Sequence, residues 1–516
     1  MTDYTIIQNS LPALQVVVPL LLAPIAVLVT IPFLSWLIAL AGSLFCLYSS
    51  ISLYFLVSEI GKINYYMGGW LPPYGIEYII DDASAFMIVL ISLMGVFATI
   101  YAFQSLKKEI NKKSQSRVYG MWLLALGGLL GLVTTGDAFN LFVFLEISSL
   151  SSVTLVALGS KNDKRALTAA FNYLLIGAVG ATFYVIGVGL LYSVTGTLNI
   201  ADLTIKLSEL TDNNSVKAGI SFIIIGLMVK AAIFPLHIWL PSAYTFAPSA
   251  VAVLLTATAT KAALYVLARI LFTLLFNADE FTVIILQWVL LPASIVAIFF
   301  GTIRAIFEKD IKKLLAFSSL SQIGYITIGL TLGTASGIMA SFIHIANHSM
   351  RKAALFMGIV AISIKFNQSI KMNNLNGLYQ LMPITSICLT IVILSLLGIP
   401  LTIGFISKVY LLKAVFSHGN WPILFIIVLT SFLALGYAWK MIENIWMKQP
   451  DNKDLLIKED PKVYFPLLVL AIFNILFGIY AYPVVNSALN AGIITATSST
   501  FTPTPFLNIK KTPFRL

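Results

Sequence analysis

The stretch LMVKAAIFPLHIWLP, residues 227–241, places one lysine, Lys230, inside an apolar run and follows it with Pro235. Proline has no backbone N–H and interrupts a helix. A charge near the centre of a bilayer costs about 2.5–3.5 kcal/mol on insertion scales, so it normally faces protein or water. Backbone that is not regularly helical is likewise tolerated at that depth only where it faces protein or water. The stretch therefore predicts a broken membrane helix with a hydrated site beside Lys230.

The composition of the whole chain is that of a membrane protein. Of its 516 residues, 59% are hydrophobic and 10% are charged. In soluble domains roughly 45–50% of the residues are apolar and about 25% are charged. Apolar runs fill nearly all of the sequence and leave no room for a soluble domain of ordinary size. The net charge of +11 comes from Lys and Arg that lie mainly in short loops. These residues indicate membrane topology rather than a nucleic-acid surface.

We predict an all-α integral membrane protein, a single polytopic domain over residues 1–516, with about fourteen transmembrane helices. The first basic residue is Lys62, so no cleavable signal is expected and the first helix should be retained. Cys46 and Cys388 lie inside apolar runs and are interpreted as buried hydrophobic residues. The predicted spans are 11–31, 34–58, 83–103, 118–135, 139–159, 166–195, 216–239, 243–276, 281–303, 315–333, 336–363, 383–412, 421–445 and 463–488.

The distribution of loop charges predicts the orientation. With this number of spans, three Lys- and Arg-rich segments fall on one side: 107–117, 161–165 and 304–313. The opposite side carries the more acidic segments 59–82 and 278–280. The positive-inside rule then places both termini outside the cytoplasm, in a cell (inner) membrane. We interpret the loop 448–462 and the tail 495–516 as solvated connectors.

Several ionisable residues fall at membrane depth, where they normally mark function. Glu146 lies in GDAFNLFVFLEISSLSS (136–152), with apolar residues before it and hydroxyl residues after it. Lys261 lies in LLTATATKAALYVLARILF (254–272), with threonine hydroxyls nearby. Lys408 follows Pro400 and Gly404 in SLLGIPLTIGFISKVYLLKAVF (395–416), which predicts a second broken helix.

One further segment, SFIHIANHSMRKAALF (341–356), carries His344, His348 and Lys352 at i, i+4 and i+8. That spacing aligns the three side chains on one helix face, with Arg351 pointing elsewhere.

Together these residues indicate a proton relay rather than isolated ion pairs that only fix helix packing. A lysine can take up or release a proton when the distance to a carboxylate changes, and histidine exchanges protons near neutral pH. Transporters use such chains of titratable groups. The candidate relay residues are Glu146, Lys230, Lys261, His344, His348, Lys352 and Lys408. The broken seventh and twelfth spans also hint at two five-helix repeats of opposite topology.

Residues 118–445 resemble the antiporter-like subunits shared by respiratory complex I, membrane-bound hydrogenases and multisubunit cation/proton antiporters. The resemblance is carried by KAAIFPLHIWLPSAYTFAPSAVAVLL (230–255) and by DIKKLLAFSSLSQIGY (310–325). HIANHSMRKAALF (344–356) is similar to a discontinuous eleventh helix and GIPLTIGFISK (398–408) to a discontinuous twelfth. GDAFNLFVFLEI (136–147) resembles the fifth helix with its glutamate.

The resemblance implies two inverted five-helix repeats, 118–276 and 281–447, with flanking regions 1–103 and 463–516. It also implies a line of charged residues across the membrane plane. In that line Glu146 pairs with Lys230, Lys261 bridges to the residues at 344–352, and Lys408 ends the line. LYSVTGTLNIADL (191–203) and Tyr244 make the chain most similar to the D-type subunit of sodium/proton antiporters. Lysine at position 408 argues against the complex I subunit whose twelfth helix ends in a carboxylate.

The favoured function is that of a proton-translocating subunit of a multisubunit monovalent cation/proton antiporter, with other membrane subunits as partners and Na⁺ or another cation exchanged for protons. The alternative is a subunit of a complex I-like enzyme or hydrogenase powered by redox chemistry, in which case the chain would be classed as part of a translocase. Without a Cys cluster or a Gly-rich nucleotide loop, no cofactor, metal or bond chemistry is expected. We also weighed a stand-alone transporter with an anionic substrate at Lys230 and a non-transporting scaffold.

Overall fold

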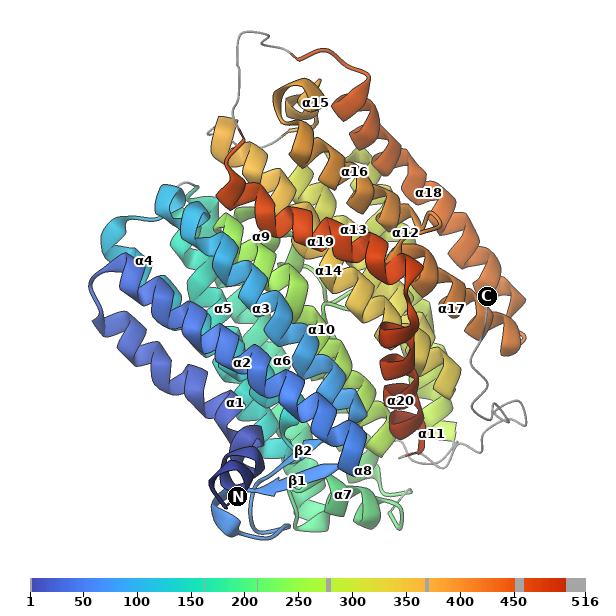
Figure 1. Cartoon of the computed structure of the whole chain (residues 1–516). Helices are drawn as coiled ribbons and strands as arrows, with labels where there is room; N and C mark the ends of the chain where they lie inside the picture. Colours follow the sequence, from blue (N-terminus) through green and yellow to red (C-terminus); the bar gives the residue numbers. More distant parts are fainter. Residues whose placement is uncertain are drawn as a thin grey trace.

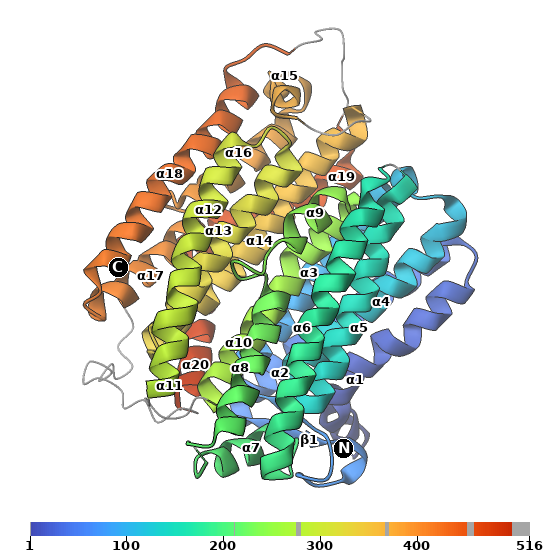
Figure 2. The same cartoon turned by 180° about the vertical axis from the view of Figure 1, so that it is seen from behind.

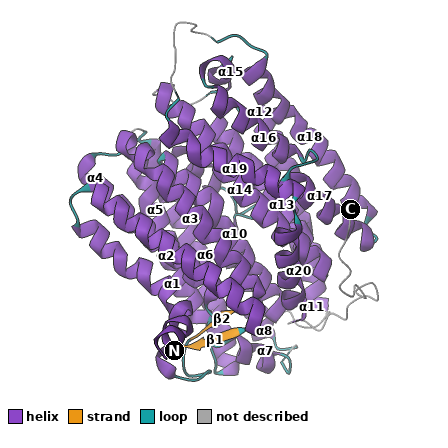
Figure 3. Cartoon of the chain, viewed as in Figure 1, coloured by secondary structure: helices purple, strands orange, loops and turns teal. Residues whose placement is uncertain are grey.

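The computed structural model describes residues 2–161, 163–210, 212–274, 280–366, 371–450 and 459–497. Figure 3 shows that this part of the chain is almost entirely helical, as the composition predicts. Most of the loop 448–462 and of the tail 495–516 lies outside the described residues, as do residues 278 and 279 of the acidic segment 278–280. The predictions made for those positions stay predictions.

The described residues before position 275 form ten α-helices and one hairpin. Strands β1 (Ile63–Tyr66) and β2 (Glu77–Ile80) pair antiparallel, with Ile63 opposite Ile80. The helices are α1 (Thr2–Leu28), α2 (Pro32–Ile60), α3 (Asp82–Glu109), α4 (Lys112–Thr134), α5 (Ala138–Ala157), α6 (Arg165–Thr195), α7 (Ile200–Leu207), α8 (Asn214–Ala231), α9 (Trp239–Phe246) and α10 (Ser249–Leu274).

The described residues from position 280 onward form ten more α-helices. A π-helical segment, Ile284–Leu290, joins the first two of them without a break. The helices are α11 (Glu280–Val283), α12 (Leu291–Phe307), α13 (Ile311–Thr331), α14 (Ala335–Phe366), α15 (Leu378–Leu381), α16 (Pro383–Leu397), α17 (Ile403–Ser417), α18 (Trp421–Trp446), α19 (Pro461–Ile479) and α20 (Tyr482–Thr497).

The number of membrane spans is smaller than the predicted fourteen when judged by length and composition. Within the described residues, eleven helical segments are long and apolar enough, or twelve if the pair α19–α20, bent by 74°, is one span. Each predicted segment contains helix, but two fail this measure. Helix α14 carries four titratable residues between positions 344 and 352, which lower its hydropathy, and the segment 383–412 is split into two 15-residue helices. The multi-pass bundle is confirmed, and the exact count is not.

Two helices are interrupted where the sequence predicts breaks. Helix α8 ends at Ala231, and Ala232 takes a left-handed conformation with φ of 56°. Helix α16 ends at Leu397, and Gly398 follows with φ of 81°, a region that glycine enters without the strain other residues incur. By contrast, α14 runs unbroken from Ala335 to Phe366, so the likeness of 344–356 to a discontinuous helix does not extend to its backbone.

Helices α10 and α14 lie side by side in the middle of the bundle, with α1 and α18 at opposite sides (Figures 1 and 2). Helix α3 packs against both central helices, and α19 crosses over α14, α16 and α17. In the most apolar stretch of α10, 94% of the residues are buried, and in that of α13 all of them are buried. Titratable side chains on these central helices are therefore enclosed by protein rather than by lipid.

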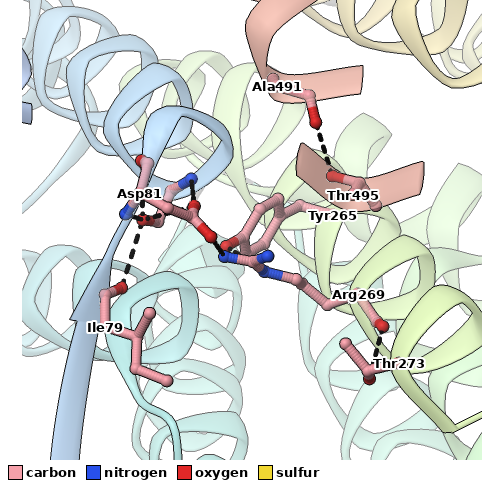
Figure 4. A network of polar contacts seen from close by, with 8 residues as sticks. Ile79, Asp81, Tyr265, Arg269, Thr273, Ala491 and Thr495 are labelled. Atoms are coloured by element: carbon pink, nitrogen blue, oxygen red, sulfur yellow. Dashed lines mark hydrogen bonds and ion pairs between the residues drawn. The ribbon is translucent and has the colours of Figure 1, made fainter. Parts of the chain in front are cut away.

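Helix α10 is held to α3 at both of its ends. At one end Arg269 of α10 forms an ion pair with Asp81, which precedes α3, and donates to the Tyr265 hydroxyl at 3.0 Å (Figure 4). At the other end, the carboxylate of Glu109 accepts a hydrogen bond of 2.7 Å from the backbone N–H of Ser249. These contacts fix the position of α10 along its axis, and with it the depth of Lys261.

The three basic segments of the sequence gather at one end of the bundle, around Ser249 and the end of α9. Lys312 donates to the Ser249 hydroxyl at 3.1 Å. The guanidinium of Arg165 lies 4.6 Å from the ring centre of Phe246. Glu109, which binds the backbone of Ser249, belongs to the segment 107–117. Their common location agrees with the predicted topology.

Helix α16 is held at its N-terminus by a distant carboxylate. Glu459, just before α19, accepts hydrogen bonds from the backbone N–H groups of Ile384 and Thr385 at 2.8 and 3.0 Å. It also accepts one from the Thr385 hydroxyl at 2.6 Å. The first N–H groups of a helix lack partners within the helix, so a carboxylate satisfies them.

Candidate functional site

Lys230 lies in the last turn of α8, beside the break, and points at α5. Its Nζ atom is 3.4 Å from Oε1 of Glu146 and donates to the Ser149 hydroxyl at 2.5 Å. The lysine side chain is 7% exposed and the glutamate side chain 27% exposed. The predicted pairing of Glu146 with Lys230 is therefore present, with a serine as an additional partner that the sequence reasoning did not assign.

The break after α8 is stabilised by aromatic residues of the following helix. The indole N–H of Trp239 donates to the Val229 carbonyl at 2.9 Å, which satisfies a backbone group near the end of α8. The Trp239 ring stacks on Tyr173 of α6 at 4.2 Å between centroids. The rings of Phe234, His237 and Phe300 contact one another, with centroid distances of 5.2 Å (Phe234–His237), 5.3 Å (His237–Phe300) and 5.5 Å (Phe234–Phe300).

Lys261 lies in the middle of α10 and is fully buried. Its ammonium group donates to the backbone carbonyl of Thr256 and lies 3.3 Å from the Thr260 hydroxyl. The hydroxyl of Tyr244 interacts with the same Thr260. Of the threonine hydroxyls that the sequence places near Lys261, that of Thr260 lies beside the ammonium group, whereas Thr256 contributes its backbone carbonyl.

His348 and Lys352 lie on α14, facing α10 and α13. The positive charges of Lys261 and Lys352 both act on His348, and neither of its ring nitrogens has a hydrogen-bond partner among the described residues. Lys352 donates to the Leu315 carbonyl at 2.7 Å and to the Ser318 hydroxyl at 2.5 Å. His348 is therefore placed between two lysines from different helices.

His344 lies one turn earlier on α14 and contacts two other helices. Its Nδ1 is 3.1 Å from the Ser407 hydroxyl on α17, and its Nε2 is 3.0 Å from Oε1 of Gln322 on α13. Arg351 donates to the same Gln322 oxygen at 2.7 Å and to the Ser395 carbonyl at 3.1 Å. The prediction that Arg351 points away from the site is wrong, because Gln322 and the end of α16 draw the guanidinium inward.

Lys408 lies on α17, after the second break. Its Nζ atom donates to the Leu397 carbonyl, the last of α16, at 2.9 Å. The alkyl chain of Lys408 packs against Gly398, where an added Cβ would lie 2.8 Å from Cδ of the lysine. Glycine at this position thus gives both the backbone turn and the space for the lysine.

The seven predicted residues can be grouped into three clusters, of which the first is joined by an ion pair and the other two by the charges that their members exert on one another. The first is Glu146 with Lys230, the second is Lys261 with His348 and Lys352, and the third is His344 with Lys408. The charges of Arg351 and Lys408 act on His344. Among the residues that the structure describes, no direct hydrogen bond or ion pair connects one cluster to the next, so a proton passing between them needs an intervening carrier such as water.

Most buried cations of the site face neutral oxygens. In the described part of the chain, Lys261, Arg351, Lys352 and Lys408 have no carboxylate within 4.0 Å. A buried charge needs a counter-charge or several hydrogen bonds. Backbone carbonyls and hydroxyls supply those bonds here. Sequence reasoning found the lysines but not these partners, because carbonyl groups carry no sequence signal.

Comparisons with known proteins identify the family of the chain. Residues 135–434 match the family described as NADH:quinone oxidoreductase/Mrp antiporter, TM. NADH-quinone oxidoreductase subunit N of Desulforudis audaxviator is 34% identical over 498 residues, which is 93% of this chain and 97% of that protein. The D-type subunit of the Na(+)/H(+) antiporter of Alkalihalophilus pseudofirmus is 31% identical over 425 residues, 82% of this chain and 84% of that protein.

A solved structure with the same fold is a chain of the membrane-bound sulfane sulfur reductase, an archaeal respiratory membrane complex. It has a TM-score of 0.87 and 31% identity, and the match covers 94% of this chain and 97% of that one. The chain therefore belongs to the NADH:quinone oxidoreductase/Mrp antiporter family of membrane subunits. The predicted resemblance to the D-type antiporter subunit is confirmed, and the identity to the relative from Desulforudis audaxviator is higher, at 34% against 31%.

Proposed function

We propose that the chain translocates protons within a multisubunit monovalent cation/proton antiporter. It lies in the cell (inner) membrane with both termini outside the cytoplasm, since the basic segments share one end of the bundle. Partner membrane subunits handle Na⁺ or another monovalent cation. The relatives named as D-type antiporter subunits support this assembly.

The observation that carries the proposal is the Lys230–Glu146 pair at the interrupted end of α8. An ammonium group 3.4 Å from a carboxylate holds a proton, and separating the two groups releases it. The break at 232–238 ends the regular helix directly after Lys230, and turn hydrogen bonds such as that from the Ile233 N–H to the Met228 carbonyl at 2.9 Å replace the helical ones. The lysine therefore has a counter-charge and lies at an irregular backbone segment.

The other residues extend the path from Lys230. We assign Lys261, His348 and Lys352 as the central group, and His344 and Lys408 as the group at the far end. The breaks after α8 and after α16 support two inverted repeats, 118–276 and 281–447, each with one lysine beside an interruption.

A second candidate is the same relay in a redox-driven complex. The 34% identity to a protein named NADH-quinone oxidoreductase subunit N, over 97% of that protein, favours it. In that case electron transfer on partner subunits would drive the protons. The residues of the relay would keep the same roles.

The test is proton transport by the intact complex in proteoliposomes, driven either by a sodium gradient or by an electron donor with quinone. Sodium-driven proton movement supports the antiporter, and donor-driven movement supports the second candidate. In either assay, Lys230→Ala should abolish transport while the complex still assembles.

Lys217→Ala is the matched control, because Lys217 lies at the start of the same helix and pairs with an exposed aspartate. Full transport by Lys230→Ala would remove Lys230 from the relay. Loss of assembly in that variant alone would indicate a packing role instead.

A further inference from the structure

His344 is held between two partners whose hydrogen-bonding roles can be deduced. Its Nε2 faces the side-chain oxygen of Gln322 at 3.0 Å, and its Nδ1 faces the hydroxyl of Ser407 at 3.1 Å. The residues concerned are buried, with relative exposures of 0–2%. Which nitrogen carries a proton is therefore set by these contacts rather than by solvent.

Arg351 decides which atom of the Gln322 amide faces His344. A guanidinium group can only donate hydrogen bonds. The Gln322 atom 2.7 Å from Nη2 of Arg351 must therefore be the oxygen, because the amide NH₂ would place donor against donor. The same oxygen faces Nε2 of His344, so Nε2 has to carry a hydrogen.

Ser407 can take either of two roles toward the other ring nitrogen. Asn347 donates to the Ser407 oxygen at 2.7 Å, and the serine hydroxyl can itself donate to the Gly404 carbonyl at 3.0 Å. When it does so, Nδ1 of His344 must be a donor, and the ring is a doubly protonated imidazolium. When the hydroxyl turns toward Nδ1, that nitrogen is an acceptor and the ring is neutral.

We propose that Arg351 is a positioning residue that, through Gln322, keeps a proton on Nε2 of His344, so that the relay proton enters and leaves at Nδ1. The proposal rests on the proton-relay function given above. On arrival of a proton from an ammonium group or a water molecule, an N–H or O–H bond of that donor breaks, an N–H bond forms at Nδ1, and the Ser407 hydroxyl turns from the ring to the Gly404 carbonyl. On departure the Nδ1–H bond breaks, the proton bonds to an amine or water acceptor and the hydroxyl turns back, so the hydroxyl proton stays on Ser407 throughout.

This arrangement fixes which side of the His344 ring exchanges protons. Nε2 faces α13, whereas Nδ1 faces α17, which carries both Ser407 and Lys408. The charged groups that act on His344 are Arg351 and Lys408. Arginine retains its proton under all ordinary conditions. Of the two basic groups, Lys408 is therefore the one able to exchange a proton, and it lies on α17 next to Ser407, which contacts Nδ1.

The experiment is ¹⁵N solid-state NMR of the full chain in lipid bilayers with labelled histidine. The chain has four histidines, and the His344→Gln variant identifies the signals of His344. In the wild type, the neutral form of His344 should carry its hydrogen on Nε2. A neutral form with the hydrogen on Nδ1 would overturn the proposal.

Substitutions at Arg351 and Gln322 test the cause. In Arg351→Met the Gln322 amide is free to turn over, so a population with hydrogen on Nδ1 should appear. Arg351→Lys retains a donor, and Gln322→Glu retains an acceptor facing both neighbours, so in both variants the neutral form of His344 should keep its hydrogen on Nε2. Unchanged His344 signals in Arg351→Met would also overturn the proposal. If Arg351→Met does not fold, the wild-type and Gln322→Glu spectra decide.

Transport by the complex gives a second, separate measurement. Arg351→Met should slow proton transport roughly tenfold, the order of effect of losing a group that orients a functional histidine, and Arg351→Lys should restore most of it. If Lys230→Ala transports normally, the relay function fails whatever the spectra show. If Lys230→Ala is inactive but the neutral His344 carries its hydrogen on Nδ1, only the role of Arg351 fails.

Discussion

Lys230 and Lys408 occupy similar places in the two halves of the chain but have different partners. Each lies beside an interrupted helix, Lys230 before the break of α8 and Lys408 after the break that follows α16. Lys230 faces a carboxylate and a hydroxyl, Glu146 and Ser149. Lys408 faces the Leu397 carbonyl and packs on Gly398.

The difference shows two ways to hold a proton on a buried amine. At Lys230 a full negative charge offsets the ammonium group, so moving Glu146 changes the energy of the protonated form directly. At Lys408 only the partial charge of a carbonyl is in direct contact, and the geometry of the helix break determines how well it is aligned. Substitutions that affect one lysine and not the other can test this distinction.

The largest effects are expected when either lysine is replaced by methionine, which has a similar shape and no charge. Proton transport should fall by at least about 100-fold in both Lys230→Met and Lys408→Met, the lower end of what a proton-transferring group contributes. Thermal unfolding should separate the two variants. Lys230→Met leaves the Glu146 carboxylate without its cation and should be destabilised, whereas Lys408→Met leaves no anion behind and should be as stable as the wild type.

A loss of stability that is equal in the two variants would remove the proposed distinction between the lysines. Transport rates measured in proteoliposomes and unfolding temperatures of the same preparations provide both readouts.

The next effect in size concerns Glu146. Glu146→Gln removes the negative charge but keeps a polar group of the same shape near Lys230, and Ser149 remains as a partner. Transport should fall roughly tenfold, in line with about 1.4 kcal/mol for one charge-assisted contact. Ser149→Ala is the comparison variant and should have a smaller effect, since it leaves the ion pair intact. A larger effect of Ser149→Ala would make the hydroxyl the main partner.

A smaller effect is expected from Gly398→Ala, which changes the backbone at the Lys408 end alone. Alanine in this left-handed conformation costs about 1–2 kcal/mol, and its Cβ would lie 2.8 Å from Cδ of Lys408. Gly419→Ala is the matched control, because Gly419 has a similar φ of 76° at the end of α17 with nothing within 4 Å of an added Cβ. Both variants should lose stability, but only Gly398→Ala should also lose transport, by several-fold.

The smallest effect concerns an exposed ion pair, Arg165 with Asp163, at 2.6 Å. The hydrogen bond from Arg165 holds the pKa of Asp163 below its usual value. The pair therefore adds stability at pH values above the usual aspartate pKa, and that stability is lost as the pH falls through the lowered pKa. Asp163→Asn should change unfolding by about 1 kcal/mol or less and leave transport unchanged, unlike Glu146→Gln.

Much of the fold could be predicted because it depends on apolar runs and on proline. Pro235 lies in the break after α8 and Pro400 in the break between α16 and α17, and every predicted span contains helix. The unbroken α14 could not be predicted, because nothing in 344–356 shows that His344, Arg351 and Lys352 form hydrogen bonds with neighbouring helices. The number of spans depends on α14, which carries more titratable residues than an ordinary span, and on the segment 383–412, whose two helices are shorter than one.

The charged residues of the site could be predicted from the sequence, but their hydrogen-bond partners could not. Glu146, Lys230 and the 344–352 face follow from the cost of charge in an apolar segment. Arg351 was assigned to the wrong direction, because only its angle to the adjacent Lys352, about 100°, was considered. Arg351 follows His344 by seven residues, which places the two side chains on nearly the same face of the helix. Its true partners, Gln322 and the Ser395 carbonyl, come from other helices. Only the packed structure brings these groups together.

The carboxylate of Glu459 at the start of α16 has a consequence at the opposite end of that helix. The peptide dipoles of a helix add up to a partial positive charge at its N-terminus and a partial negative charge at its C-terminus. Glu459 lies against the positive end, and the last carbonyls receive Arg351 and Lys408. Helix α16 has 15 residues, which span about 22 Å at 1.5 Å per residue. A carboxylate therefore lies at the positive end of its dipole, and two basic side chains lie at the negative end. A proton that leaves Lys408 changes the electrical balance of the whole helix as well as that of one side chain.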